Sequence, residues 1–145
     1  MKAVLQRVSS ACVRVEGAEV GRIGSGLLVF LGVLAPDDEA AVERLLDRVL
    51  GYRVFSDAGG KMNLALAEVG GELLVVSQFT LAADGRKGRR PSFDAAAPPA
   101  RARELYELFV QRARERVPRV ATGAFGAHMT VEIVNDGPAT FLLEA

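Results

Sequence analysis

The chain has 145 residues, half of them hydrophobic and a quarter charged, with a formal net charge of zero. This composition predicts one globular domain, residues 1–145, that buries about two-thirds of its unfolded surface, and it excludes a disordered polymer. No apolar run approaches the roughly 18 residues of a membrane-spanning helix, so we expect no membrane partner.

Cysteine and histidine are too scarce for several kinds of chemistry. The single Cys12 has no partner for an internal disulfide, and the first residues lack a secretory pattern, so we expect a reducing, cytoplasmic setting. One cysteine and one histidine do not make a zinc site of these residue types, which takes three or four ligands. Since glycine-rich phosphate motifs are also missing from the sequence, we expect no metal and no cofactor.

The basic residues are unevenly distributed. Residues 86–119 hold ten of the eighteen basic residues and four acidic ones, which gives this segment a charge of +6 and the remainder −6. Such asymmetry favours an anionic partner on one side of the molecule. The alternative is an arginine-rich helix face that is simply solvated, and the sequence leaves both interpretations open.

The first part of the chain predicts antiparallel strands. Residues 4–8 alternate weakly between apolar and polar side chains, residues 11–16 alternate clearly, and glycines then mark short turns. Residues 27–34 are apolar throughout, which predicts a central strand buried on both faces.

Two helices are predicted. The first begins after Pro36 with Asp37 as its N-cap and ends near Gly51, and the second opens at the prolines 98–99 and ends at Pro118. Each has an apolar stripe that we expect to face the sheet. The stripes consist of Val42, Leu45, Leu46 and Val49 in the first helix, and of Ala102, Leu105, Phe109 and Ala113 in the second.

A buried strand leads to the first candidate site. Residues 73–76 form an apolar, β-branched run too short for a helix, and polar side chains follow it. The basic segment 85–91 comes next, so this strand end predicts a site for a phosphate-bearing ligand. Alternatively, the hydroxyls of Ser77 and Thr80 merely end a strand and begin a turn.

The last part of the chain contains a second unusual stretch. Residues 127–133 alternate strictly and residues 141–143 are apolar, with Gly137-Pro138 between them. An ordinary proline there would break the strand ladder, so backbone geometry is the expected role of this stretch. His128 falls on the same strand face as polar neighbours, so we expect it to be exposed and structural rather than a catalytic base.

Two motifs carry a resemblance to a known family. Ser77-Gln78-Phe79-Thr80-Leu81 and Asn135-Asp136-Gly137-Pro138-Ala139-Thr140 resemble the motif pair of the bacterial and eukaryotic D-aminoacyl-tRNA deacylases, although Ala139 stands where the family usually has valine. Further fragments resemble the same family, and together they extend over nearly the whole chain. They are Gln6-Arg7-Val8, Gly24-Ser25-Gly26-Leu27, Gly60-Lys61-Met62-Asn63, Arg90-Pro91-Ser92-Phe93 and Gly123-Ala124-Phe125-Gly126-Ala127.

The resemblance implies a fold and an activity. The implied fold is one compact α/β domain of mostly antiparallel or mixed β-sheets with two main helices packed on them. The implied enzyme hydrolyses the ester of D-aminoacyl-tRNA, spares L-aminoacyl-tRNA and so proofreads chirality in translation. A site that works by excluding an L side chain would also accept glycyl-tRNA.

The resemblance further implies a cytoplasmic homodimer whose active sites span both subunits. Each site would contain Ser77, Gln78, Phe79 and Thr80 of one chain, and a cis Gly137-Pro138 peptide of the other. Backbone N–H groups near Phe79 and Thr80 would stabilise the oxyanion, and the ribose 2′-hydroxyl would assist attack by water. The cations expected to hold the tRNA acceptor backbone are Arg86, Lys87, Arg89 and Arg90.

Three alternatives remain open on the sequence alone. Thr80 is a candidate nucleophile, although nothing near it in sequence would activate it. A small-molecule esterase using Ser77 or Thr80 would act on simple esters without tRNA. A non-catalytic RNA-binding module would show salt-sensitive binding without turnover.

Overall fold

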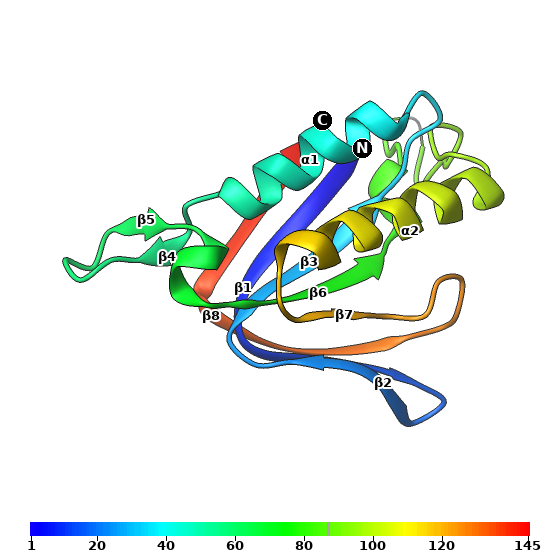
Figure 1. The fold of residues 1–145 in the computed structure, drawn as a ribbon. Coiled ribbons are helices and arrows are strands. Elements are labelled where there is room, and N and C mark those ends of the chain that lie inside the picture. The colour runs from blue at the N-terminus through cyan, green and yellow to red at the C-terminus, as the bar shows by residue number, and fades with distance from the viewer. Residues whose placement is uncertain (87) are drawn as a thin grey trace.

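The computed structural model describes residues 1–86 and 88–145, in which a six-stranded sheet carries two helices and a two-stranded hairpin projects from one end (Figure 1). The helices are α1 (Glu39–Gly51) and α2 (Pro99–Arg116), with two short 3-10 helices, η1 (Leu66–Val69) and η2 (Phe79–Ala82). The strands are β1 (Lys2–Val15), β2 (Ala18–Ile23), β3 (Gly26–Gly32), β4 (Phe55–Ser56), β5 (Met62–Leu64), β6 (Glu72–Ser77), β7 (Val120–Thr122) and β8 (Thr130–Glu144). The expectation of an α/β domain with a mixed sheet and two helices is confirmed.

The main sheet combines both kinds of pairing. Its order is β2-β1-β3-β6-β7, and β8 pairs with β1. β1 is antiparallel to β2, β3 and β8, whereas β6 is parallel to β3 and β7. The parallel neighbours need crossovers, and these contain α1 and α2 respectively.

Both predicted apolar stripes face the sheet. The buried residues of α1 are Ala41, Val42, Leu45, Leu46 and Val49, and those of α2 are Leu105, Tyr106, Phe109, Val110 and Ala113. They pack in one core against β1, β3 and β6. Neither helix of the described residues is long and apolar enough to cross a bilayer.

A second, smaller core lies on the other side of the sheet, because the sheet curls. It contains Val8, Val13, Leu28 and Val76 among others. β2 approaches β7 so closely that a Cβ on Gly21 would overlap the backbone carbonyl of Thr122. The curl therefore depends on a residue without a side chain at this contact.

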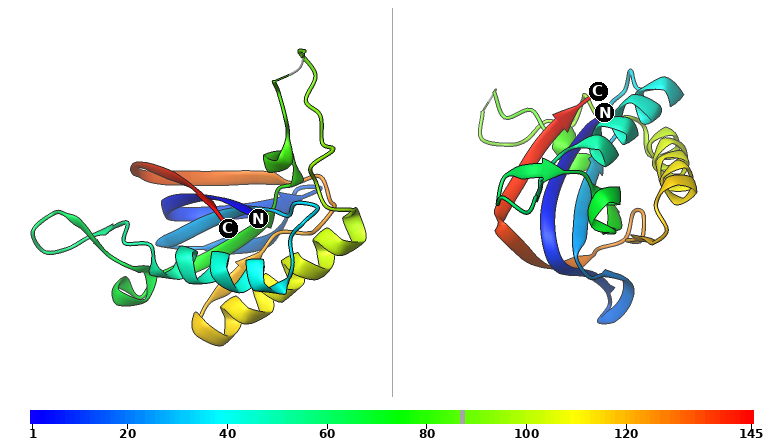
Figure 2. Two further views of the ribbon diagram at one scale, coloured as in Figure 1. Left: turned by 90° about the horizontal axis from the view of Figure 1, so that it is seen from above. Right: turned by 60° about the vertical axis from the view of Figure 1, so that its left-hand side comes forward.

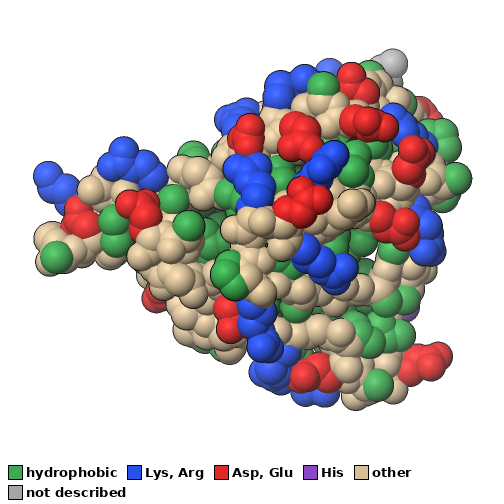
Figure 3. All heavy atoms as spheres, viewed as in Figure 1, with side chains coloured by type: hydrophobic (Ala, Val, Ile, Leu, Met, Phe, Trp, Pro, Cys, Tyr) green, Lys and Arg blue, Asp and Glu red, His purple; other side chains and the backbone are tan. Residues whose placement is uncertain are grey.

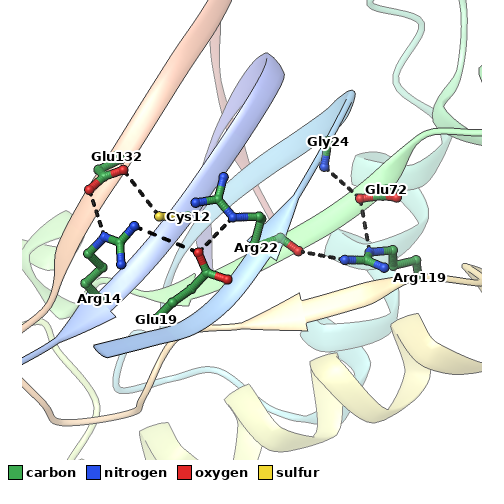
Figure 4. Close-up of polar contacts among 8 residues, drawn as sticks. All are labelled: Cys12, Arg14, Glu19, Arg22, Gly24, Glu72, Arg119 and Glu132. Atoms are coloured by element: carbon green, nitrogen blue, oxygen red, sulfur yellow. Dashed lines mark hydrogen bonds and ion pairs between the residues drawn. The ribbon is translucent and has the colours of Figure 1, made fainter. Parts of the chain in front are cut away.

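Polar contacts fasten the curled strands to one another (Figure 4). Arg14 of β1 pairs with Glu132 of β8 at 2.9 Å, and Glu132 also accepts a hydrogen bond from the Cys12 thiol. Near the start of β7, Arg119 pairs with Glu72 of β6 at 3.1 Å and donates to the carbonyl of Arg22 in β2. Burial raises the pKa of the Cys12 thiol, with Glu132 adding to the effect, so Cys12 is a poor nucleophile.

Three local predictions need correction. Residues 4–8 and 11–16 belong to one strand, β1, whose pairing with β8 shifts register between Gln6 and Ser10. The N-cap of α1 is Asp38, whose carboxylate accepts from the Ala41 amide, whereas Asp37 accepts from the Leu34 amide and from the Met1 amino group. β8 is also one strand, which continues past the Gly-Pro stretch because β1 supplies partners on both sides of it.

Candidate active site

The first motif begins where β6 leaves the sheet. Ser77 is the last residue of β6, and the Gln78 amide donates to the carbonyl of Leu31 in β3 at 2.8 Å. The chain then turns into η2 across Gly32, where a Cβ would come within 3.0 Å of the Gln78 carbonyl. Phe79 and Thr80 consequently emerge on the surface, and the Phe79 side chain is 58% exposed.

A cavity of about 670 Å³ opens beside this strand end. Its wall is mostly apolar and comes from β3, β6, the start of α2 and the segment between β7 and β8. Its polar and aromatic lining residues are Ser77, Gln78, Phe79, Phe93, Phe125 and His128. Three of the four predicted catalytic residues therefore share one cavity, and Thr80 lies just outside its lining.

His128 is exposed, as the strand pattern predicts, but it also lines this cavity. It precedes β8 instead of lying within it, because the strand begins at Thr130. The segment before it, residues 123–127, brings His128 to the cavity, because Gly123 packs beside Val76 and its amide donates to the Val75 carbonyl.

The side chains around Thr80 are not arranged to activate its hydroxyl. The Gln78 side-chain amide donates to Thr80 Oγ1 at 2.5 Å, and the Phe79 ring lies 5.2 Å from the Phe93 ring. Within residues 1–86 and 88–145, no carboxylate or imidazole hydrogen-bonds the Thr80 hydroxyl. The same residues contain no cluster of three potential metal-binding His, Cys, Asp or Glu side chains.

The second motif forms a loop that swings out of β8. Asn135 pairs with Val8 and Thr140 with Gln6, so residues 136–139 bulge out opposite the single residue Arg7. The Gly137-Pro138 peptide bond is cis, Gly137 has φ +134, and both residues are exposed. The loop thus presents backbone, rather than a large side chain, to its surroundings.

Arg7 supports this loop from behind, and its role was not recognised in the sequence. Its guanidinium donates from Nε to the Asp136 carbonyl at 3.0 Å and from Nη1 to the Val54 carbonyl at 2.6 Å. The side chain is only 12% exposed, and its Nη2 would lie 2.9 Å from a Cβ on Gly137. The signal available in the sequence was an arginine in the middle of a strand, within the fragment Gln6-Arg7-Val8.

Asn135 closes the loop from within. Its side-chain oxygen accepts from the Ala139 amide at 3.0 Å, and its Nδ2 donates to Thr140 Oγ1 at 3.0 Å. Gln6 of β1 donates to the same hydroxyl. Ala139 itself is buried, so the smaller side chain at this position packs inside the loop.

The two motifs lie far apart within one chain. Ser77 is level with Leu31 of β3, Ala3 of β1 and Leu143 of β8, whereas the loop lies opposite Arg7. Four residues along β1 and three strand spacings across the sheet give a separation of about 20 Å along its surface. A single chain therefore does not bring Gly137-Pro138 to the cavity.

The predicted basic cluster is divided by the structure. Arg86 pairs with Asp84 at 2.7 Å, and its hydrogen bonds lower the pKa of Asp84 to about 2. Arg89 and Arg90 are exposed, and Lys87 lies outside the described residues. The segment between η2 and α2 projects away from the sheet in the left view of Figure 2.

The arginines of α2 do not form a basic face. Arg101 and Arg103 pair with Glu104 and Glu107 of the same helix, and Figure 3 shows positive and negative side chains interspersed over the helices. Arg112 pairs with Glu43 of α1 at 3.1 Å, and Arg116 with Asp47 at 2.6 Å. Tertiary contacts with Glu43, Asp47 and Glu72 therefore offset part of the local excess of positive charge in the sequence.

Comparisons with known proteins agree with these features. The profile of the family described as D-Tyr-tRNA(Tyr) deacylase matches residues 4–144. A D-aminoacyl-tRNA deacylase of Azotobacter vinelandii is 61% identical over 145 residues, 100% of both chains, and one of Salmonella typhimurium is 58% identical over 144 residues, 99% of both.

Solved structures give the same fold. The structure of a c-Myc DNA unwinding element binding protein is similar with a TM-score of 0.95 and 40% identity, over 100% of this chain and 99% of that one. A probable eukaryotic D-amino acid tRNA deacylase has a TM-score of 0.84 at 20% identity, over 99% and 98% of the two chains, and shares the fold. From the profile match and the full-length relatives, the chain belongs to the D-Tyr-tRNA(Tyr) deacylase family.

Proposed function

We propose that this chain is a cytoplasmic D-aminoacyl-tRNA deacylase, which hydrolyses the ester of D-aminoacyl-tRNA and of glycyl-tRNA and spares L-aminoacyl-tRNA. The observation that carries the proposal is the pair of exposed backbone motifs. One lies beside a large apolar cavity, and the other is a firmly held loop that presents a cis Gly137-Pro138 peptide.

The cavity suits the 3′-terminal adenosine of tRNA. Its wall contains the aromatic rings of Phe79, Phe93 and Phe125 with few polar groups, which favours a planar base over a phosphate. The phosphates then lie outside the cavity, where the exposed Arg89 and Arg90 are available to them. The aminoacyl ester follows the ribose toward the Ser77–Thr80 segment.

The proposed chemistry uses backbone groups. Phe79 and Thr80 are the first two residues of η2, so their amides have no acceptor inside that helix and are available to a developing oxyanion. Since an aminoacyl ester is already activated, water assisted by the ribose 2′-hydroxyl suffices as nucleophile. Thr80 Oγ1 instead accepts a hydrogen bond from Gln78, which holds the turn in shape.

The proposed chirality filter comes from a second subunit. Because Gly137-Pro138 lies about 20 Å from its own cavity, it serves the cavity of a partner in a homodimer. Exposed apolar side chains on β8, such as Val134 at 56% and Leu142 at 59%, support a protein partner on this strand. In the partner's site the loop backbone meets hydrogen on the Cα of a D-substrate but a side chain on that of an L-substrate.

The direct test compares D-tyrosyl-, L-tyrosyl- and glycyl-tRNA as substrates of the purified protein. We expect rapid hydrolysis of the D-tyrosyl and glycyl esters, little change in the L-tyrosyl ester, and the same result in the presence of a chelator. Equal rates on the two tyrosyl enantiomers would overturn the proposal. Binding without turnover would favour a nucleic-acid-binding protein.

The cross-subunit arrangement has its own test. A Gly137→Ala chain and a chain with a disabled Phe79 segment are each expected to keep only a small fraction of the wild-type activity as homodimers. Mixed together, they form a heterodimer with one intact site and regain part of the activity. Failure to complement, with heterodimers demonstrated by mass spectrometry, would contradict a shared site.

A further inference from the structure

The β4–β5 hairpin is an exposed element to which the proposed function assigns no role. It projects from the left-hand end of the molecule in Figure 1, away from η2 and the start of α2. Its base is anchored by Phe55, which is buried in the main core, whereas its tip is exposed. The hairpin is therefore attached firmly at one end and open to a partner at the other.

The hairpin tip is ordered by its own hydrogen bonds. One oxygen of the Asp57 carboxylate accepts from the amides of Gly59 at 2.9 Å and Lys61 at 3.0 Å, and the Asp57 amide donates to the Lys61 carbonyl at 2.8 Å. These bonds fix the position of Lys61 without covering its side chain. They also occupy one oxygen of the nearest carboxylate with backbone partners.

Two basic side chains of the hairpin remain available. Lys61 and Arg53 are exposed, and within the described residues neither forms an ion pair. Arg53 lies beside the second strand of the hairpin, since its Nε donates to the Asn63 carbonyl at 2.7 Å. The left-hand projection in Figure 3 carries both basic and acidic side chains. Unlike Arg112 and Arg116 of α2, Lys61 and Arg53 are not paired with a carboxylate in the part of the chain that the structure describes.

The hairpin is joined to the Gly137-Pro138 loop. Arg7 donates to the Val54 carbonyl, next to β4, and to the Asp136 carbonyl within the loop. The rings of Tyr52 and Phe141 pack edge to face, with centroids 5.4 Å apart, and Phe141 follows the loop in β8. These contacts hold the base of the hairpin in a constant position relative to the loop, so a partner that contacts the loop also lies near the hairpin.

We infer that Lys61 of the β4–β5 hairpin and Arg53, which directly precedes it, bind phosphates of the tRNA acceptor end held in the partner subunit's site. This inference rests on the proposed function, in which the Gly137-Pro138 loop of one chain enters the cavity of the other. When the 3′-terminal nucleotide occupies that cavity, the rest of the RNA chain must leave the cavity beside the elements that flank the loop, including the hairpin. The hairpin supplies cations on one side of this exit, and the exposed Arg89 and Arg90 of the catalytic chain supply them on the other.

The test uses the complementing heterodimer. The donor chain carries Phe79→Pro and supplies the intact loop, and the catalytic chain carries Gly137→Ala and supplies the intact Ser77–Thr80 segment. Lys61→Ala is placed in one chain or the other. In the donor chain it should raise KM for D-tyrosyl-tRNA by about two- to fivefold at low salt, because the variant no longer binds one exposed phosphate. In the catalytic chain it should leave KM unchanged.

Further readouts separate RNA binding from a structural effect. The donor-chain variant should keep its kcat, and its KM for D-tyrosyl-adenosine, which has no phosphate, should not change. The salt dependence of log K for tRNA should become shallower by about 0.7 to 0.9 for each cation removed. Lys61→Arg should behave as the wild type, and Arg44→Ala, at an exposed position on α1 without an ion pair in the described residues, is the matched control.

The outcomes distinguish the two proposals. If the wild-type protein does not hydrolyse D-aminoacyl-tRNA, the proposed function fails. If it does, but Lys61→Ala raises KM in neither chain or only in the catalytic chain, the hairpin inference is overturned. A weaker dimer measured by sedimentation, with unchanged RNA affinity per dimer, would also overturn it and assign the hairpin to protein contact.

Discussion

Position 137 requires glycine for two reasons, its backbone conformation and the lack of space for a side chain. Its φ of +134 lies in a region that L side chains rarely adopt, and a Cβ would come within 2.9 Å of Arg7 Nη2. Arg7 has little room to retreat, because it is largely buried and bonded to the carbonyls of Asp136 and Val54. Any side chain at residue 137 therefore shifts the loop backbone itself.

We predict that Gly137→Ala reduces kcat/KM for D-tyrosyl-tRNA by about a hundredfold, since a displacement of about 1 Å in a reacting site has that order of effect. Steady-state kinetics and a thermal unfolding curve on the same sample test this. Gly51→Ala, where a Cβ meets no atom within 4 Å, is the control and should keep full activity. A fully active Gly137→Ala protein would remove the loop from the mechanism.

At Phe79 the amide and the ring can be separated by substitution. Gln78 has φ −142 and ψ 79, outside the α region that a following proline disfavours, and Phe79 begins η2, so proline is tolerated at residue 79 while deleting its N–H. Phe79→Ala keeps the amide and removes the ring. We expect Phe79→Pro to lower kcat by about 10²- to 10³-fold, as loss of one oxyanion donor does, and Phe79→Ala to act mainly on KM. Equal kcat values for both variants would refute the role of this amide.

Thr80 tests which hydroxyl takes part in the reaction. Because Thr80 Oγ1 has no base beside it in the described residues, Thr80→Ala should retain much of the kcat. A tRNA ending in 2′-deoxyadenosine should instead be hydrolysed slowly by the wild type, measured in single-turnover experiments. The opposite pair of results would identify Thr80 as the nucleophile.

At the scale of elements, α2 is tied to β6 directly before the candidate site. The buried Tyr106 hydroxyl donates to the Val75 carbonyl at 2.9 Å, and its ring lies 5.6 Å from that of Phe125 in the cavity wall. Arg103 covers the same Phe125 ring at 4.9 Å. The helix therefore positions one wall of the cavity relative to Ser77.

Burial raises the pKa of Tyr106 to about 12, which predicts a pH dependence of stability. The folded pKa lies above the unfolded value of about 10, so the stabilising effect is complete below pH 10 and disappears as the pH rises toward 12. At pH 8, Tyr106→Phe should cost about 1 kcal/mol of unfolding free energy. At pH 11 the difference between variant and wild type should narrow in urea titrations, whereas a constant difference would contradict the burial effect.

At the scale of the whole molecule, exposed cations lie on two separate projections. Arg89 and Arg90 lie in the chain between η2 and α2, and Lys61 lies in the β4–β5 hairpin, which projects from a different part of the molecule (Figure 2). The arginines of α2, by contrast, are mostly paired with carboxylates. In the homodimer that we propose, the projection of one chain and that of its partner would face the same tRNA end.

We predict that Arg89→Ala with Arg90→Ala flattens the salt dependence of tRNA binding, by about 0.7 to 0.9 in the logarithmic slope for each phosphate that the variant no longer neutralises. Filter binding over a range of potassium chloride concentrations measures the slope. Arg112→Ala, which removes a charge that is paired with Glu43, should leave the slope unchanged. An unchanged slope in the double variant would mean that these arginines are only solvated surface.

Features that depend on local pattern could be predicted from the amino-acid sequence alone. The apolar run 73–76 predicted β6, the stripes at helical spacing predicted the buried faces of α1 and α2, and the two motifs indicated the family. The predicted cap of α1 was wrong by one residue, because Asp37 is bonded to the Met1 amino group and the Leu34 amide, which the local pattern does not reveal.

Features that depend on residues distant in sequence required the tertiary structure. Arg7 meets residue 136 because β1 and β8 are paired, and the arginines of α2 meet Glu43 and Asp47 because the two helices pack side by side. The same strand registers separate Ser77 from Gly137 by about 20 Å, although both motifs are obvious in the sequence. Composition and periodicity report how each segment buries its own surface, whereas these contacts arise only when segments far apart in the chain share one sheet.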